Sequence, residues 1–152
     1  MQDTFAQFTL VILKMSKLVQ KIKAQEMNKF DLKAVHVMCL YLLRVHPEGF
    51  SISELCRQTL DDKAAMSRAV AQLRERGFVT SKPSGHSFTV QLTEEGERFA
   101  DYIASRVGCA VAAGSVEMTD EERSRFFSVL EEICSKLEQY YEQLLREGDV
   151  EL

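Results

Sequence analysis

Two apolar stripes, one near each end of the chain, constrain the fold more than any other feature. Near the N-terminus, apolar residues recur at alternating steps of three and four residues, at Phe5, Phe8, Ile12, Met15, Val19 and Ile22. Near the C-terminus the same spacing joins Phe126, Leu130, Ile133, Leu137, Tyr140 and Leu144. This spacing is typical of a long helix that packs one face against another helix. We call the two stripes the N-terminal seam and the C-terminal seam.

The chain between the seams is short. With 152 residues the protein fits one domain. A core of this size does not bury both seams, so the simplest expectation is a homodimer whose terminal helices interlock around a two-fold axis. We therefore predict dimerisation helices in residues 1–30 and 115–147, a compact core in residues 50–93 and a connecting long helix in residues 94–114.

The predicted core contains two short helices followed by a hairpin. Ser53 is expected to cap a helix that runs to Thr59, and Asp62 a second helix over residues 63–76 that ends at Gly77. Residues 78–81 and 87–92 have strand composition, with turn residues at 83–86 between them. The fold class is therefore mainly α (α+β): a winged helix-turn-helix core with long N- and C-terminal dimerisation helices.

Charge is distributed unevenly along the chain. The formal net charge is −4, which by itself argues against nucleic-acid binding. However, residues 63–92 contain five basic side chains and one acidic side chain, whereas residues 115–152 contain eleven acidic and four basic ones. A local basic patch matters more for phosphate binding than the total charge does.

Residues 52–96 resemble the MarR family of bacterial regulators. The matching features are a short helix containing leucine, a turn with Asp, Ser-Arg within the second helix, Leu-x-x-x-Gly-Phe-Val leading into the wing, and Leu-Thr-x-x-Gly opening the next helix. The resemblance implies a homodimeric, sequence-specific transcription factor that binds double-stranded DNA at a pseudo-palindromic operator. It also implies a repressor that a small ligand, of unknown identity, relieves. The chain departs from the family in the wing, because it lacks the family's Asp-x-Arg motif.

The residues predicted to contact DNA lie on the second short helix and around it. A period of about 100° per residue places Ala64, Arg68 and Ala71 on the face opposite the core. Two alanines allow close approach to the major groove, and Arg68 has the reach to contact guanine O6 and N7. The predicted DNA-binding residues are Ser53, Lys63, Ala64, Ala65, Ser67, Arg68, Arg74, Lys82, Ser84 and His86.

An effector pocket is expected from the family resemblance. Its candidate residues are Phe8, Ile12, His36, Phe99 and Ile103. An oxidant-sensing thiol is the alternative, with Cys109 as the candidate because its neighbours are small. The four cysteines form no CxxC pair, and the three histidines offer no pair at metal-ligand spacing, so we expect no metal and no cofactor.

Other classes of function are weighed on the same residues. The chain contains no glycine-rich phosphate loop, nucleophile elbow or HExxH motif, so we do not expect an enzyme. We expect a cytoplasmic protein that does not bind membranes, because no signal peptide or spanning segment is present. A winged-helix protein-interaction module without DNA binding remains the alternative to a DNA-binding regulator.

Overall fold

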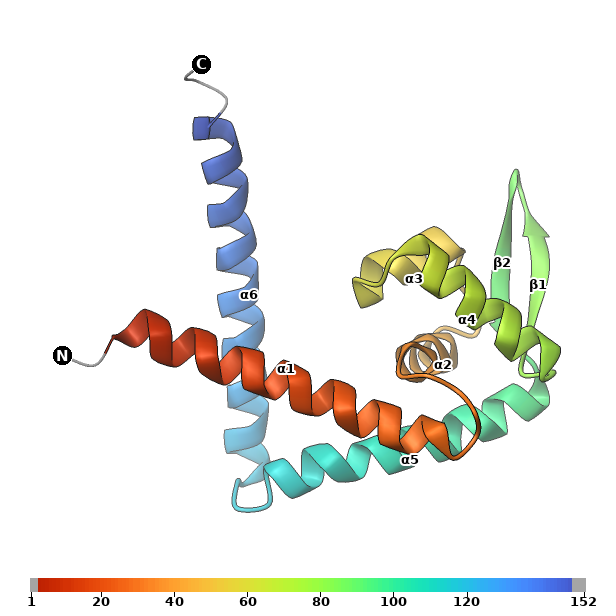
Figure 1. Cartoon of the computed structure of the whole chain (residues 1–152), viewed down its shortest axis with the longest axis horizontal. Coiled ribbons are helices and arrows are strands. Elements are labelled where there is room, and N and C mark those ends of the chain that lie inside the picture. Colours follow the sequence, from red (N-terminus) through yellow and green to blue (C-terminus); the bar gives the residue numbers. More distant parts are fainter. Residues whose placement is uncertain (1–2, 149–152) are drawn as a thin grey trace. The chain divides into compact units, whose positions relative to one another are not determined.

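The computed structural model describes residues 3–148, so the first two residues of the predicted segment 1–30 lie outside it. Two compact units are present, residues 1–111 and residues 112–152. The elements (Figure 1) are α1 (Thr4–Asn28), α2 (Val35–Val45), α3 (Ile52–Thr59), α4 (Lys63–Glu75), β1 (Val79–Ser84), β2 (Ser87–Leu92), α5 (Glu94–Gly114) and α6 (Asp120–Gly148). The fold class predicted from the sequence, a winged helix-turn-helix core with long terminal helices, is confirmed.

Helices α3 and α4 form the helix-turn-helix. The cap of α3 is Ser51 rather than the predicted Ser53: the Ser51 hydroxyl accepts from the backbone N–H of Glu54 (3.2 Å), and the Glu54 carboxylate accepts from the backbone N–H of Ser51 (2.7 Å). This reciprocal capping box starts the helix two residues earlier than expected. Leu60 ends α3 in the left-handed conformation (φ 61°), and Asp62 caps α4 as predicted.

The core of the first unit lies between α2 and α4 (Figure 1). Helix α2 is buried over much of its surface, as expected for a run that is apolar nearly all round. The inner face of α4 packs against it through Met66, Val70 and Leu73, each at most 1% exposed. The core is completed by Met27, Leu32, Val37, Cys39, Leu40, Leu43, Leu55, Val79, Val90, Ala100 and Ile103.

The wing is an antiparallel hairpin with Val79 opposite Leu92 and Ser84 opposite Ser87. Pro83, which we expected in the turn, lies within β1 opposite Phe88, so that the turn is shortened to Gly85 and His86. Gly85 takes the positive φ (61°) that a tight hairpin turn requires. A proline is tolerated in β1 because this strand lies at the edge of a two-stranded sheet.

A backbone contact joins the start of α5 to the start of β1. Thr93 caps α5 by accepting from the N–H of Gly96 (3.0 Å), and its hydroxyl donates to the Gly77 carbonyl (2.6 Å). A Cβ added at Gly96 would stand 1.8 Å from the Phe78 carbonyl oxygen. The absence of a side chain at this glycine therefore allows α5 to pass directly against the chain that enters the wing.

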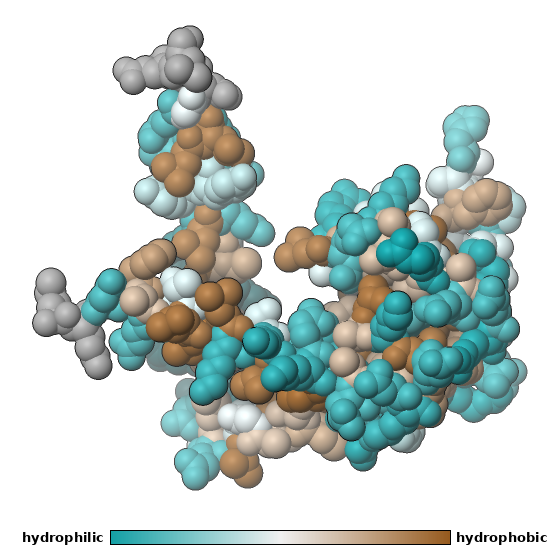
Figure 2. All heavy atoms as spheres, viewed as in Figure 1, coloured by the Kyte–Doolittle hydropathy of each residue, from teal (hydrophilic) through white to brown (hydrophobic). Residues whose placement is uncertain are grey.

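Both seams are exposed in the single chain. Along α1, the side chains of Phe8, Ile12, Met15, Val19 and Ile22 are between 39% and 51% exposed. Helix α6 has no buried residue over Asp120–Gly148, and Leu137, Tyr140 and Leu144 are 45–58% exposed. Figure 2 shows apolar side chains at the surface of both helices. None of the described helices is long and apolar enough to cross a membrane.

Substitution of Gly96 tests the close approach of α5. We expect Gly96→Ala to lower the free energy of unfolding by about 1–3 kcal/mol, because the new methyl group displaces the Phe78 backbone. Gly108→Ala in the same helix meets no atom within 4 Å and is expected to raise stability by about 0.5–1 kcal/mol through helix propensity. Urea denaturation followed by circular dichroism measures both; equal stability of the two variants would contradict the contact.

Candidate nucleic-acid interface

The outer face of α4 is the candidate recognition surface. Ala64, Arg68, Ala71 and Glu75 are exposed, while the opposite face is buried in the core, so the predicted division of the helix into two faces is confirmed. Two of these four residues are alanines, so a ligand can approach the backbone of the helix at these positions. Arg68 is the long cationic side chain on this face.

The N-terminal end of α4 carries both a cap and a lysine. The Asp62 carboxylate accepts from the N–H of Ala65 (2.8 Å), which satisfies one of the free N–H groups at the start of the helix. Lys63 is exposed in the first turn, and Ser67 is half-buried one turn later. The Asp62 carboxylate already uses the positive end of the helix dipole, so Lys63 is the group at this end that favours a phosphate.

Arg74 connects α4 to the wing, a role that the sequence analysis missed. Its guanidinium donates to the hydroxyl of Ser81 in β1 (2.7 Å). Both residues line a groove of about 280 Å³ between α3, α4 and the wing, together with Ile52, Phe88 and Val90. Arg74 therefore holds the wing at a fixed position beside α4 while it lines the groove.

Arg76 connects the other side of α4 to the turn between α1 and α2. Its guanidinium donates to the carbonyl of Phe30 (2.6 Å) and approaches the carboxylate of Asp31 (3.7 Å). This arginine contributes to the basic character of residues 63–92, but its side chain is engaged by the protein. Sequence periodicity gives no signal for such a contact, because 46 residues separate the two partners.

The distal half of the wing is fully accessible. Every residue from Lys82 to Phe88 is exposed, including the predicted contacts Lys82, Ser84 and His86. The Ser87 hydroxyl donates to the Ser84 carbonyl (3.2 Å), which stabilises the tip. Ser53 is exposed near the N-terminus of α3, although it is not the cap. The predicted contacts thus lie on the helix-turn-helix and on the wing that follows it.

His36 lies beside α4 rather than in a cavity with the other effector candidates. Its ring is buried, and its Nδ1 accepts from the backbone N–H of Lys33 (2.9 Å). It lines a cavity of about 320 Å³ with Arg68 and Gln72. Burial lowers the pKa of His36 below its ordinary value, and the charges of Lys33 and Arg76 lower it further.

The remaining effector candidates are dispersed over the first unit. Phe8 and Ile12 are exposed on α1, and Ile103 is buried in the core. The Phe99 ring stacks on Phe78, with ring centroids 4.4 Å apart. The cavity that His36 lines contains none of these residues. An effector pocket built from them remains a prediction.

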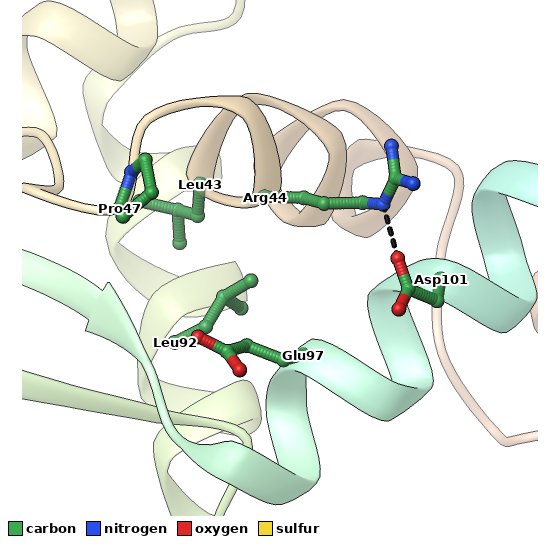
Figure 3. Close-up of a pocket in the computed structure, with 6 residues that line it drawn as sticks. All are labelled: Leu43, Arg44, Pro47, Leu92, Glu97 and Asp101. Atoms are coloured by element: carbon green, nitrogen blue, oxygen red, sulfur yellow. Dashed lines mark hydrogen bonds and ion pairs between the residues drawn. The ribbon is translucent and has the colours of Figure 1, made fainter.

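A polar cleft lies between α2 and α5 (Figure 3). Arg44 of α2 and Asp101 of α5 point toward one another and form an ion pair, while Glu97 lies one turn earlier on α5. Leu43, Pro47 and Leu92 supply the apolar lining of this cleft of about 330 Å³. None of the predicted effector residues lines it. Its ion pair helps to fix α5 against α2.

The cysteines differ in accessibility. Cys39 is buried, and burial raises the pKa of its thiol to about 12, so it remains protonated. Cys109 is exposed on α5, where its thiol donates to the Ser105 carbonyl (3.3 Å). A redox role for Cys109 stays a prediction. Among residues 3–148, no three His, Cys, Asp or Glu side chains gather as metal ligands would.

A helix-turn-helix followed directly by an antiparallel hairpin defines the class of winged helix-turn-helix proteins, to which this chain belongs by its fold. The model of the MarR family matches residues 30–87, which confirms the resemblance seen in the sequence. No curated protein sequence matches the chain.

Solved structures extend the likeness to nearly the whole chain. A MarR protein from Peptoclostridium difficile has a TM-score of 0.78 at 18% identity and covers 95% of each chain. A MarR-family transcriptional regulator from Rhodococcus sp. RHA1 has a TM-score of 0.77 at 20% identity, covering 88% of this chain and 97% of that one. CouR from Rhodococcus jostii RHA1, bound to p-coumaroyl-CoA, has a TM-score of 0.75 at 20% identity, covering 88% and 95%. The fold is therefore that of MarR-family transcriptional regulators, which are not enzymes.

Protonation of His36 should couple the stability of this region to pH. Because the pKa of His36 is lowered in the folded protein, the unfolded chain binds more protons below about pH 6.5, and stability falls as the pH falls. The slope from one group is at most about 1.4 kcal/mol per pH unit. We expect His36→Asn, which keeps an acceptor for the Lys33 N–H, to reduce the slope between pH 7.5 and 5.5.

Urea denaturation at several pH values measures this effect. Ser84→Ala, at the exposed wing tip, is the control: it removes no titratable group and should retain the slope of the unmodified protein. A slope that is the same in His36→Asn and in the unmodified protein would contradict the assignment.

Proposed function

We propose that this protein is a cytoplasmic transcriptional regulator of the MarR family that binds double-stranded DNA as a homodimer. The observation that carries the proposal is the outer face of α4, where Arg68 stands between small side chains beside a wing that bears Lys82 and His86. No carboxylate occurs from Arg76 to Thr93, so the wing does not repel a phosphate backbone. The match of residues 30–87 to the MarR family model supports the same conclusion.

In this function α4 enters the major groove. Arg68 contacts guanine O6 and N7, the commonest specific contact of an arginine, while Ala64, Ala65 and Ala71 allow the helix to approach. Lys63, Ser67 and Ser53 face the neighbouring phosphates, with Lys63 supplying a positive charge and the two serines supplying hydroxyl donors. Arg74, Lys82, Ser84 and His86 extend the contact surface along the groove and the wing.

The two seams supply the dimer interface. The apolar side chains on α1 and α6 are far more exposed than a core face, and a second copy is the simplest partner that covers both. A two-fold dimer places two α4 helices on one side of the duplex, and two half-sites one helical turn apart follow from that symmetry. The operator is therefore expected to be pseudo-palindromic.

Repression relieved by a small ligand is the regulatory mode that we propose. Relief requires a site that is coupled to α4, and His36 contacts the cavity beside Arg68. Phe8 and Ile12 on the N-terminal seam, with Phe99 and Ile103, remain candidates for contacts with the ligand, although the single chain does not bring them to the cavity at His36. The similar CouR structure contains p-coumaroyl-CoA, which supports a ligand-responsive regulator without identifying the ligand here. Oxidation of Cys109 is the alternative signal.

Two observations favour a second candidate function. The net charge of −4 and the wing without Asp-x-Arg weaken the electrostatic case for DNA. A winged-helix module that binds another protein through its acidic C-terminal region would fit both features.

A fluorescence-anisotropy titration separates the two functions. The duplexes are the DNA upstream of the protein's own gene and a scrambled duplex of equal length, each at two salt concentrations. Tight, sequence-selective binding that weakens steeply with salt is expected of the regulator. Absence of binding at low salt, to these duplexes and to a random-sequence pool, would favour the interaction module. Sedimentation velocity on the same sample is expected to give a dimer.

Removal of the Arg68 side chain tests the specific contact. We expect Arg68→Ala to weaken binding to the preferred site by about 1–3 kcal/mol and to relax selectivity at one base-pair position. Competition with single-base-pair variants of the site measures this selectivity. Unchanged affinity would contradict the role of Arg68.

Lys82→Ala is the matched comparison, because this exposed lysine is expected to contact phosphate. Binding should weaken by a similar factor on all duplexes, and the salt slope should fall by about 1. A loss confined to one base position would contradict that assignment.

A further inference from the structure

The distal wing carries an exposed apolar pair that the proposed contacts leave unused. Phe88 is 63% exposed, and its partner across the hairpin is Pro83, which is also exposed. Single exposed apolar residues are common on proteins. Here two of them are paired at the end of a projecting hairpin (Figure 1), beyond the layer that packs on the core.

The alternation of the strands decides which way this pair faces. Residues Val79, Ser81 and Pro83 share one face of the hairpin with their partners Phe88 and Val90. At the base of the wing this face is the inner one, because Val79 and Val90 are buried. Phe88 therefore lies on the side of the wing that faces α4, and it shares the groove lined by Ile52 and Arg74.

Folding of the hairpin does not require the Phe88 ring. The base is held by the buried valines, by the bridge between Phe50 and Val90, and by the bond from Arg74 to Ser81. The ring extends this inner face outward, past the last buried residue. The Phe88 ring is therefore free to contact a partner that binds to the wing and to α4 at the same time.

The surrounding charge identifies the class of partner. Lys82 precedes Pro83, Arg74 lines the groove, and no acidic residue occurs from Arg76 to Thr93. A polyanion is therefore favoured as the partner over a basic protein surface. In the proposed complex α4 occupies the major groove, and the distal wing, which projects beyond Arg74, lies over the adjacent minor groove.

We propose that Phe88, supported by Pro83, is an apolar wedge that inserts at a base step in the minor groove of the bound DNA. Phenylalanine and proline are among the side chains that partly unstack base steps from this groove and bend the duplex. Contact of this kind reads the deformability of a step rather than its hydrogen-bonding pattern. The proposal rests on the proposed DNA binding and adds a specificity-determining residue to it.

The test uses the full-length protein and a duplex obtained by random-site selection. 2-Aminopurine is placed, one position at a time, at the steps flanking each half-site, because its fluorescence rises when it is unstacked. The unmodified protein is expected to brighten the probe at one step in each half-site. Phe88→Ala should remove this signal and weaken binding about tenfold, as loss of one base–aromatic contact does. Phe88→Leu should retain part of both effects.

Thr80→Ala is the control, because Thr80 is exposed on the opposite face of the same hairpin. It is expected to leave the affinity and the probe signal unchanged. Circular dichroism and the unfolding midpoint of each variant test whether the protein remains folded. We expect it to, because the Phe88 side chain is largely exposed and contributes little to the core.

The outcomes separate the wedge from the proposed function. Specific binding by the unmodified protein, with no probe brightening at any step or with Phe88→Ala within twofold of it, overturns the wedge and leaves DNA binding intact. A change in sedimentation coefficient of Phe88→Ala without a change in affinity assigns the ring to a protein contact and also overturns it. Failure of the unmodified protein to bind any duplex overturns both proposals.

Discussion

The packing of α4 on α2 determines the direction of every other functional group in the first unit. Met66, Val70 and Leu73 are buried in the common core, so the remaining faces of the helix have fixed orientations. Arg68 points outward between two alanines, and Arg74 points toward the wing. Burial of one helical face therefore provides the rigidity that a sequence-reading surface needs, and the hydrogen bonds of Arg74 and Arg76 add to it.

Much of this arrangement was predictable, because it depends on local patterns. The helical period placed the buried and exposed faces of α4 correctly, and Asp62 caps its helix as expected. The errors were also local: the Ser51–Glu54 pair carried the capping signal that was assigned to Ser53, and strand pairing extended through Pro83. In both cases the correct signal was present in the sequence, but a neighbouring residue of similar preference competed with it.

Contacts between distant segments were not predictable in the same way. The bonds from Arg74 to Ser81 and from Arg76 to Phe30 depend on the final positions of whole elements, and periodicity reports only which face a residue occupies. The position of His36 beside α4, rather than among the other effector candidates, has the same origin. If the effector pocket is formed by two copies of the chain, neither the sequence pattern nor the structure of one copy defines its lining.

The bond between Arg76 and the turn after α1 has a mechanical consequence. The C-terminal end of α4 is attached to the carbonyl of Phe30, two residues beyond the end of the helix that carries the N-terminal seam. Helix α4 cannot tilt at this end unless the turn moves with it or the hydrogen bond breaks. While this hydrogen bond is intact, a displacement of the last turn of α1 moves the C-terminal end of the helix that presents Arg68. The N-terminal seam and the recognition surface are therefore mechanically coupled through one turn of the chain.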